Sequence, residues 1–164
     1  MNIWNHKKPK GVMLTNSNIK TSILNISNFL NLNGHDKISI IKNTTNISTL
    51  VGEIFVGIYN QCSFFLSNYL PIPQYISSII NDEYISILFA TPSILINILE
   101  SRIKININLI NMIHFSGKFV NYETIYKFMN YFTGINLIQG YGLTEASPRI
   151  TQISLEDMLS KKIQ

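Results

Sequence analysis

Residues 140 to 145 combine side chains that could hold a nucleotide and a metal ion. Gly140 and Gly142 allow a ligand to lie close to the main chain, and Tyr141 between them offers a ring face to a flat base. Thr144 offers a hydroxyl group to a phosphate, and Glu145 offers an oxygen ligand that Mg²⁺ accepts together with substrate phosphate. A glycine-rich turn with a surface acid is the alternative, and these residues alone favour neither interpretation.

Small and hydroxyl-bearing residues also follow two earlier apolar stretches. Ala90-Thr91-Pro92-Ser93 follows residues 85–89, and Ser116-Gly117-Lys118 follows residues 112–115. In open α/β sheets, ligands bind beyond the carboxyl ends of the strands. We therefore predict that these two segments and the 140–145 segment line one crevice.

Short β-branched stretches alternate with stretches of helical periodicity along the chain, which predicts βαβ units and a largely parallel sheet. The predicted strands are residues 11–15, 37–42, 62–66, 85–89, 112–115 and 135–139. The predicted helices are residues 16–30, a segment from Thr44 or Thr45 to Ile58, residues 74–81, a helix beginning at Thr91-Pro92, and residues 121–132. Residues 155–163 are predicted as a weak helix or a frayed tail. The expected fold class is a layered α/β fold with helices packed on the sheet.

The helix after Thr45 has the strongest period in the sequence. Its apolar residues recur at helical spacing and predict one buried face. These residues are Ile47, Leu50, Val51, Ile54, Phe55 and Ile58. We also expect part of this apolar surface to lie uncovered in a chain of this length, which favours association.

Composition excludes several classes of protein. With 164 residues, 46% of them hydrophobic and 13% charged, the chain is long enough for one domain and too apolar for disorder. The net charge of +4 is scattered, so we expect no nucleic-acid partner. Polar residues interrupt every long apolar run, so we expect no membrane span. The single cysteine, Cys62, predicts a buried structural thiol and a cytoplasmic location, and His6, His35 and His114 have no metal-ligand spacing.

Four segments together resemble the acyl-adenylate-forming (AMP-binding) superfamily, of the acyl-CoA synthetase or long-chain fatty acid–CoA ligase type. Gln139-Gly140-Tyr141-Gly142-Leu143-Thr144-Glu145-Ala146-Ser147-Pro148 resembles its nucleotide motif. Lys8-Pro9-Lys10-Gly11-Val12-Met13-Leu14-Thr15 resembles the end of its phosphate loop and the following strand. Phe89-Ala90-Thr91-Pro92-Ser93 resembles the step before its substrate pocket, and Phe115-Ser116-Gly117-Lys118 resembles its segment beside the adenine. The resemblance covers residues 9 to 151 and implies that residues 1–164 are a middle part of the large N-terminal domain, without the C-terminal lid.

The resemblance also implies roles for individual residues. The nucleotide-binding residues would be Ser116, Gly117, Lys118, Gly140, Tyr141, Gly142 and Thr144. The catalytic residues would be Thr144 at the α-phosphate, Glu145 as the Mg²⁺ ligand and Lys10 beside the polyphosphate. The implied reaction joins a carboxylic acid to ATP as an acyl-adenylate, then to the thiol of coenzyme A or a carrier-protein phosphopantetheine.

The sequence departs from the family pattern in ways that leave alternatives open. No glycine-rich phosphate loop precedes Pro9, Lys118 stands where the family has a small residue, and residues 42–46 lack the histidine of many members. We expect a ligase fragment in fatty acid metabolism that is inactive alone. The alternatives are one half of a split ligase completed by a second polypeptide, a non-catalytic remnant or interaction module, and an unrelated α/β nucleotide binder.

Overall fold

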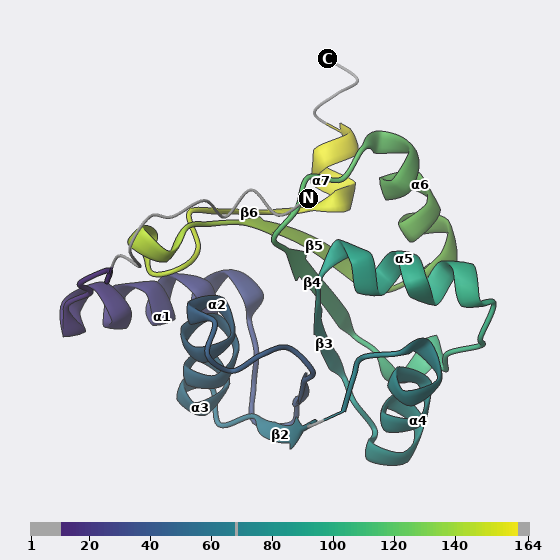
Figure 1. Cartoon of the computed structure of the whole chain (residues 1–164), viewed down its shortest axis with the longest axis horizontal. Helices are drawn as coiled ribbons and strands as arrows, with labels where there is room; N and C mark the ends of the chain where they lie inside the picture. The colour runs from purple at the N-terminus through teal and green to yellow at the C-terminus, as the bar shows by residue number, and fades with distance from the viewer. Residues whose placement is uncertain (1–10, 68, 161–164) are drawn as a thin grey trace, which may run out of the picture.

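The central feature of the computed structural model, which describes residues 11–67 and 69–160, is a six-stranded sheet (Figure 1). In chain order its strands are β1 (Lys37–Ile40), β2 (Ser63–Leu66), β3 (Ile87–Ala90), β4 (Met112–Ser116), β5 (Asn136–Tyr141) and β6 (Thr151–Ser154). The order across the sheet is β2-β1-β3-β4-β5-β6, and only the β5–β6 pair is antiparallel. The predicted α/β fold with a largely parallel sheet is confirmed.

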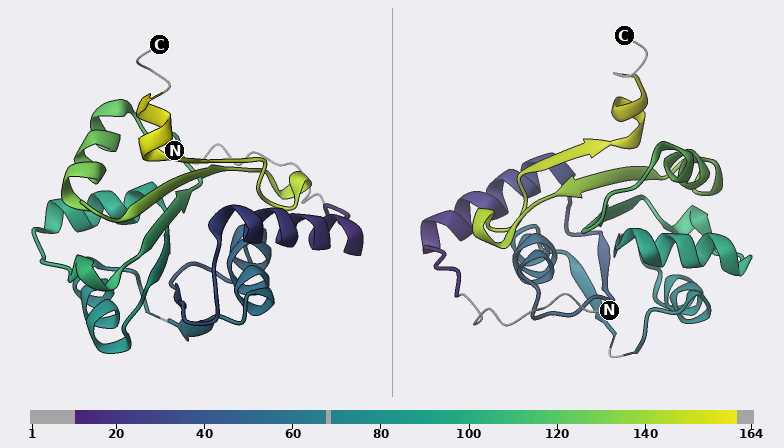
Figure 2. Two further views of the ribbon diagram at one scale, coloured as in Figure 1. Left: turned by 180° about the vertical axis from the view of Figure 1, so that it is seen from behind. Right: turned by 45° about the horizontal axis from the view of Figure 1, so that its top comes forward.

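Helices cover both faces of this sheet, so the fold has three layers (Figure 2). On one face lie α1 (Asn16–Leu30), α2 (Ile47–Thr49), the π-helical segment η1 (Leu50–Phe55) and α3 (Val56–Tyr59). On the other face lie α4 (Pro73–Glu83), α5 (Pro92–Ser101), α6 (Tyr122–Tyr131) and α7 (Leu155–Ser160). Short 3₁₀ helices, η2 (Ile107–Leu109) and η3 (Thr144–Ala146), lie in the connections.

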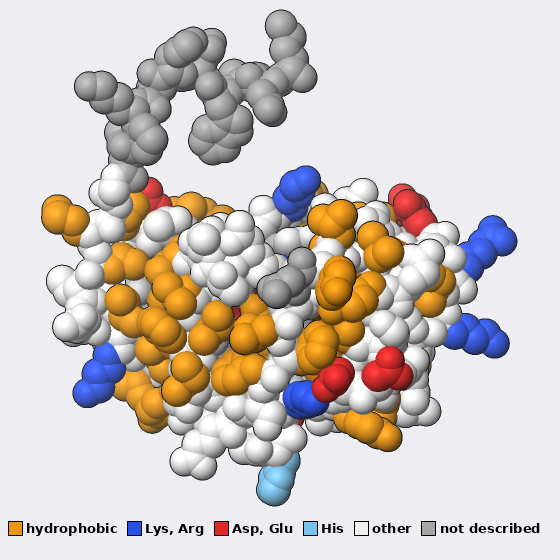
Figure 3. Space-filling view, turned by 60° about the horizontal axis from the view of Figure 1, so that its bottom comes forward, with side chains coloured by type: hydrophobic (Ala, Val, Ile, Leu, Met, Phe, Trp, Pro, Cys, Tyr) orange, Lys and Arg blue, Asp and Glu red, His pale blue; other side chains and the backbone are white. Residues whose placement is uncertain are grey.

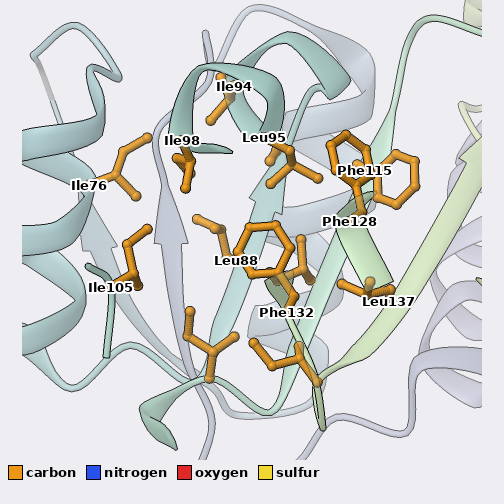
Figure 4. Close-up of a cluster of buried hydrophobic side chains, with 14 of the residues drawn as sticks. Ile76, Leu88, Ile94, Leu95, Ile98, Ile105, Phe115, Phe128, Phe132 and Leu137 are labelled. Carbon is orange, nitrogen blue, oxygen red and sulfur yellow. The ribbon is translucent and has the colours of Figure 1, made fainter. Parts of the chain in front are cut away.

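The layer formed by α4 to α7 packs on the sheet mainly through apolar side chains (Figure 4). Phe115 of β4 and Phe128 of α6 meet edge to face, with ring centroids 5.5 Å apart. Around them, Figure 4 shows side chains from the sheet and from α4, α5 and α6 converging on one another, including Ile76, Leu88, Leu95, Ile98 and Leu137. Removal of these apolar side chains from water is the main source of stability for the fold.

The segment from α2 to α3 lies where the sequence predicts a helix, but it buries a different face. Val51 is fully buried as predicted, whereas Leu50 is 36% exposed and Ile58 is 60% exposed. Glu53 is fully buried in their place. The reason is the π-helical stretch at residues 50–55, whose i→i+5 hydrogen bonds depart from the 3.6-residue period on which the prediction rests.

An apolar groove of about 500 Å³ runs between α1 and α3. It is lined by Asn16, Ile19, Lys20, Ile23, Leu24, Phe55, Ile58 and Tyr59. Figure 3 shows hydrophobic side chains gathered over this side of the molecule, at the left of the view. Of the residues expected around this uncovered surface, Ile47, Leu50, Ile54 and Phe55, Phe55 lines the groove together with Ile58, and Leu50 is 36% exposed outside it.

One predicted strand was wrong, and one strand was missed. Residues 11–15 form no strand; instead Thr15 caps α1, accepting a 3.1 Å hydrogen bond from the Asn18 amide in a reciprocal capping box. β6 was missed because this edge strand is polar at Thr151, Gln152 and Ser154, and its antiparallel pairing with β5 breaks the predicted βαβ order.

Cys62 is buried, as predicted. Burial, with the nearby Asp36 carboxylate, raises the pKa of its thiol to about 11, so the reactive thiolate is scarce at neutral pH. Across the part of the chain that the structure describes, no helix is long and apolar enough to cross a membrane.

Candidate functional site

The loops that follow β4 and β5 meet at the carboxyl edge of the sheet. Ser116 at the end of β4 lies beside Gly140 of β5 in the parallel register. Both residues line a cavity of about 160 Å³. Its walls are Asn46, Ile47, Ser48, Ser116, Gly117, Gly140, Tyr141, Gly142, Leu143, Thr144, Pro148 and Arg149. The structure thus brings together every residue predicted to bind the nucleotide except Lys118.

The other predicted residues lie elsewhere. Glu145 is exposed and lines a second cavity of about 510 Å³ beside α1, and Lys118 is exposed and lines neither cavity. Thr91 caps α5, accepting a 3.4 Å hydrogen bond from the Ile94 amide, and residues 90–93 do not line the smaller cavity. We predicted that all three segments line one crevice, and this prediction was wrong for residues 90–93. Lys10 lies outside the described residues.

The loop between β5 and β6 is held by its own backbone. The Ile150 amide donates a 2.9 Å hydrogen bond to the Tyr141 carbonyl, which closes the loop at its base. A Cβ atom at residue 142 would lie 1.6 Å from the Pro148 carbonyl oxygen, so only glycine fits there. Tyr141 is 58% exposed, which leaves its ring available to stack on a ligand.

A group of charged side chains lies on the α1 and η1 side of the sheet, next to the 160 Å³ cavity. Lys42 and Glu53 form an ion pair, and the Glu53 side chain is fully buried. Arg149 donates hydrogen bonds to the Gly52 carbonyl at 3.0 Å and to Oε1 of Gln152 at 2.9 Å. Its guanidinium carbon also lies 5.3 Å from the centre of the Phe89 ring, a cation–π distance. We call Lys42, Glu53, His114, Arg149 and Gln152 the polar cluster.

His114 is the fully buried histidine of this cluster. Its ring lies 5.6 Å from that of Phe89, neither nitrogen makes a close hydrogen bond among the described residues, and the Gln152 side chain acts on the ring in favour of its protonated form. A Cβ atom at residue 140 would lie 2.6 Å from Nε2 of His114, so glycine at this position leaves room for the imidazole beside the cavity wall. Burial holds the pKa of His114 well below 6.5, and the positive charges of Arg149 and Lys42 lower it further.

The pKa values of Glu53 and Arg149 are also shifted from their ordinary values. Burial raises the pKa of Glu53, although Lys42 and then Arg149 favour its ionised form. Burial lowers the pKa of Arg149 to about 10, and the charge of Glu53 partly offsets this. Arg149 is therefore still a cation at neutral pH.

Sequence reasoning did not identify this cluster. The sequence prediction did not single out Glu53, and it named His114 only as a histidine without metal-ligand spacing. A lone acid inside the helical stretch 47–58 was the available signal, since a buried carboxylate requires a partner. Its ion-pair partner Lys42 lies outside the predicted helix, and Arg149, which contacts the neighbouring Gly52, lies 97 residues further along the chain.

Comparison with known proteins identifies the family and the fold. The family model for the AMP-binding enzyme matches residues 8–163. The O-succinylbenzoate coenzyme A synthetase of Bacillus subtilis, solved with ATP and a magnesium ion, superposes with a TM-score of 0.81 at 22% identity, over 93% of this chain and 31% of that one. The N-terminal domain of FACL13 from Mycobacterium tuberculosis gives a TM-score of 0.83 at 18% identity, over 98% and 40%. A comparison with curated protein sequences found no match.

The likeness to these solved structures concerns the fold, because the identities are low. This chain spans between 31% and 40% of their lengths. The family match, in contrast, extends over almost all of the 164 residues. Together with the cavity formed at the ends of β4 and β5, it shows that the chain belongs to the AMP-binding enzyme family, that of the adenylate-forming enzymes.

Proposed function

We propose that this chain binds ATP with Mg²⁺ and forms part of the site at which a carboxylic acid is adenylated. The observation that carries the proposal is the 160 Å³ cavity, in which the strand ends place Ser116, Gly140, Tyr141 and Thr144 together. The volume is below the roughly 300–1,000 Å³ of pockets that enclose a whole small molecule. The cavity would therefore hold one end of the nucleotide, with Tyr141 against the base and Thr144 at the α-phosphate.

The residues present fit a magnesium ion held partly by the nucleotide. Within the described residues, no group of three His, Cys, Asp or Glu side chains could hold a metal ion by itself. Mg²⁺ is commonly bound by one or two carboxylates together with substrate phosphates, and keeps several waters. Glu145, exposed one residue beyond Thr144, supplies one such carboxylate. When bound, the ion would neutralise charge on the phosphates.

For the whole protein we propose an ATP-dependent ligase reaction. An acyl-adenylate forms with release of pyrophosphate, and the acyl group then passes to the thiol of coenzyme A or of a carrier-protein phosphopantetheine. The family match and the structural likeness to a coenzyme A synthetase of Bacillus subtilis support this reaction. Lys10 would assist at the polyphosphate, and the single cysteine supports a cytoplasmic location.

Nucleotide binding by the purified chain tests the proposal. Titration with AMP and with ATP–Mg²⁺, followed by ligand-observed NMR, should give a dissociation constant of about 1 mM, equivalent to about 4 kcal/mol. Thr144→Ala should weaken both ligands, whereas Glu145→Ala should remove mainly the Mg²⁺ dependence of ATP binding. Matched controls are Thr133→Ala and Glu156→Ala, exposed positions beside a different cavity. Equal binding by the wild type, the site variants and the controls would refute the site.

We propose further that these 164 residues do not activate an acid alone. Loss of one preorganised donor commonly costs a factor of about 10²–10³ in rate, and these residues span only 31% to 40% of the solved structures that they match. ATP–pyrophosphate exchange with the purified chain should stay at background. Exchange restored by a second polypeptide would support a split ligase, and exchange by the chain alone that Thr144→Ala removes would overturn the proposal of inactivity.

A further inference from the structure

The segment that carries Thr144 lies at the surface and makes few contacts with the rest of the fold. Residues 143–145 are exposed, and the backbone amides of Ala146 and Ser147 donate hydrogen bonds to carbonyls within the same turn. Ser147 also has a φ of 57°, in the left-handed region that is unfavourable for a residue with a side chain. Such a conformation persists where surrounding contacts fix it, so this loop requires an anchor outside itself.

Arg149 is that anchor, because it joins the loop of residues 142–150 to two other elements. Its Nη2 atom donates a 3.0 Å hydrogen bond to the Gly52 carbonyl in η1. Its guanidinium carbon lies 5.3 Å from the centre of the Phe89 ring in β3. The other hydrogen bonds of residues 142–149 with the described part of the chain stay within the loop or go to Gln152 of β6. The bond to Gly52 therefore fixes the loop against the α1 and η1 layer.

Gly52 allows this contact because it has no side chain. A Cβ atom at residue 52 would lie 3.2 Å from Nε and 3.3 Å from Nη2 of Arg149, so the guanidinium would have to move. Glycine lets this planar group lie directly against the backbone of η1. The stretch is also π-helical, a conformation that occurs frequently at functional sites.

The contact between Arg149 and Gly52 joins two opposite walls of the 160 Å³ cavity. One wall is the loop, with residues 141–144, and the other is the start of α2, with residues 46–48. Because η1 continues directly from α2, a bond from the loop to Gly52 sets the spacing between these walls. The position of Thr144 in the cavity then depends on Arg149.

We propose that Arg149 is a positioning residue, whose contacts with Gly52 and Phe89 hold the loop where Thr144 meets the nucleotide phosphate. This inference rests on the proposed function, because it assumes that Thr144 binds phosphate. Arg149 acts through Thr144 and requires no contact with the ligand. A loop that is already ordered loses less conformational entropy when the ligand binds, so the anchor increases nucleotide affinity.

Backbone ¹⁵N relaxation of the ligand-free 164-residue chain measures the order of the loop directly. The order parameter of the Thr144 amide should be about 0.85 in the wild type and below about 0.6 in Arg149→Met. Arg149→Lys keeps a cation and a donor for the Gly52 carbonyl, so it should give an intermediate value. The Phe128 amide in α6 is the internal reference and should not change. An unchanged order parameter for Thr144 in folded Arg149→Met would overturn the inference.

Gly52→Ala displaces the guanidinium without removing it. It should weaken AMP binding about fivefold in ligand-observed NMR, the contribution typical of one hydrogen bond. Gly57→Ala is the matched control in the same layer, because its Cβ atom would lie 2.5 Å from the Phe64 ring and away from the loop. The control should lose stability in urea denaturation and keep its AMP affinity. Equal losses of AMP affinity in folded Gly52→Ala and Gly57→Ala would overturn the inference, because general destabilisation would then explain both.

The Thr144→Ala background separates positioning from a general effect on the site. In the wild-type background, Arg149→Met should weaken AMP binding about fivefold. In the Thr144→Ala background, it should weaken AMP binding by less than about twofold, because the group that it positions is gone. Equal losses in the two backgrounds would overturn the positioning role.

The wild-type chain separates this inference from the proposed function. If the wild type does not bind AMP, the proposed function fails, and the order parameter of Thr144 still tests the anchor. If the wild type binds AMP and folded Arg149→Met binds it equally well, only the inference about Arg149 fails.

Discussion

The two helical layers of this fold differ in what they bury. The layer of α4 to α7 covers its face of the sheet with Ile, Leu and Phe side chains. The face toward α1, η1 and α3 also holds the Lys42–Glu53 ion pair, the buried His114 of β4 and the half-buried Arg149 of the β5–β6 connection. Apolar burial is favourable wherever the shapes fit, but buried charges are costly unless they are paired. One face of the sheet is therefore built for stability. The other face buries charged groups, which lowers the stability of the fold, beside the cavity proposed to bind ligands.

Replacing Phe128 by Ala should produce the largest effect, in the apolar layer. Phe128 is fully buried and packs against Phe115, and a Phe→Ala change in a core commonly lowers the free energy of unfolding by about 3–5 kcal/mol. Urea denaturation measures the loss. Tyr126→Ala, at a 54% exposed position on the same helix, is the control and should change the free energy by less than about 0.5 kcal/mol. Similar losses for the two variants would contradict the packing of α6.

Glu53→Gln should destabilise the other layer by about 3 kcal/mol, because it leaves Lys42 without its carboxylate partner. Lys42 keeps 10% of its side chain exposed, which places the loss at the lower end of the usual range. The double variant Lys42→Met/Glu53→Leu should recover most of the stability, since it removes both charges. If the double variant is as unstable as the single one, the cost arises from packing and not from the unpaired charge.

The pH dependence of stability should report on His114. Its pKa is lowered in the folded state, so the unfolded chain binds more protons below the ordinary value of 6.5. The free energy of unfolding should therefore fall as pH drops from about 6.5 to 5, by up to about 1.4 kcal/mol per pH unit. The raised pKa of Glu53 acts in the opposite direction. The informative quantity is thus the difference between wild type and His114→Gln, which share Glu53; parallel pH profiles would exclude a buried neutral histidine.

The smallest effects should come from helix caps, and they should be equal in the two layers. Thr15 caps α1 and Asn121 caps α6, each accepting a hydrogen bond from a backbone amide of the first turn. Replacing either residue by Ala should cost about 1 kcal/mol in urea denaturation. A much smaller loss for Thr15→Ala would indicate that the start of α1 contributes little to the stability of its layer.

The sequence by itself determined the features that depend on neighbours along the chain. The period of the helices, the alternation with β-branched stretches and the glycines of the 140–145 segment predicted an α/β fold and a loop that binds at the strand ends. The prediction of a strand at residues 11–15 was wrong, because strand-forming residue types alone do not provide a neighbouring strand to pair with. Thr15 instead caps the N-terminus of α1.

Tertiary structure decided which side chains meet. Glu53 lies buried in a π-helical stretch beside Lys42, and Arg149, in the connection between the paired strands β5 and β6, contacts Gly52. Glu145 and Thr144 are adjacent in the sequence, yet only Thr144 lines the 160 Å³ cavity, whereas Glu145 lines the larger one. Local periodicity carries no information about contacts between residues a hundred positions apart, and the charge balance of the candidate site depends on such contacts.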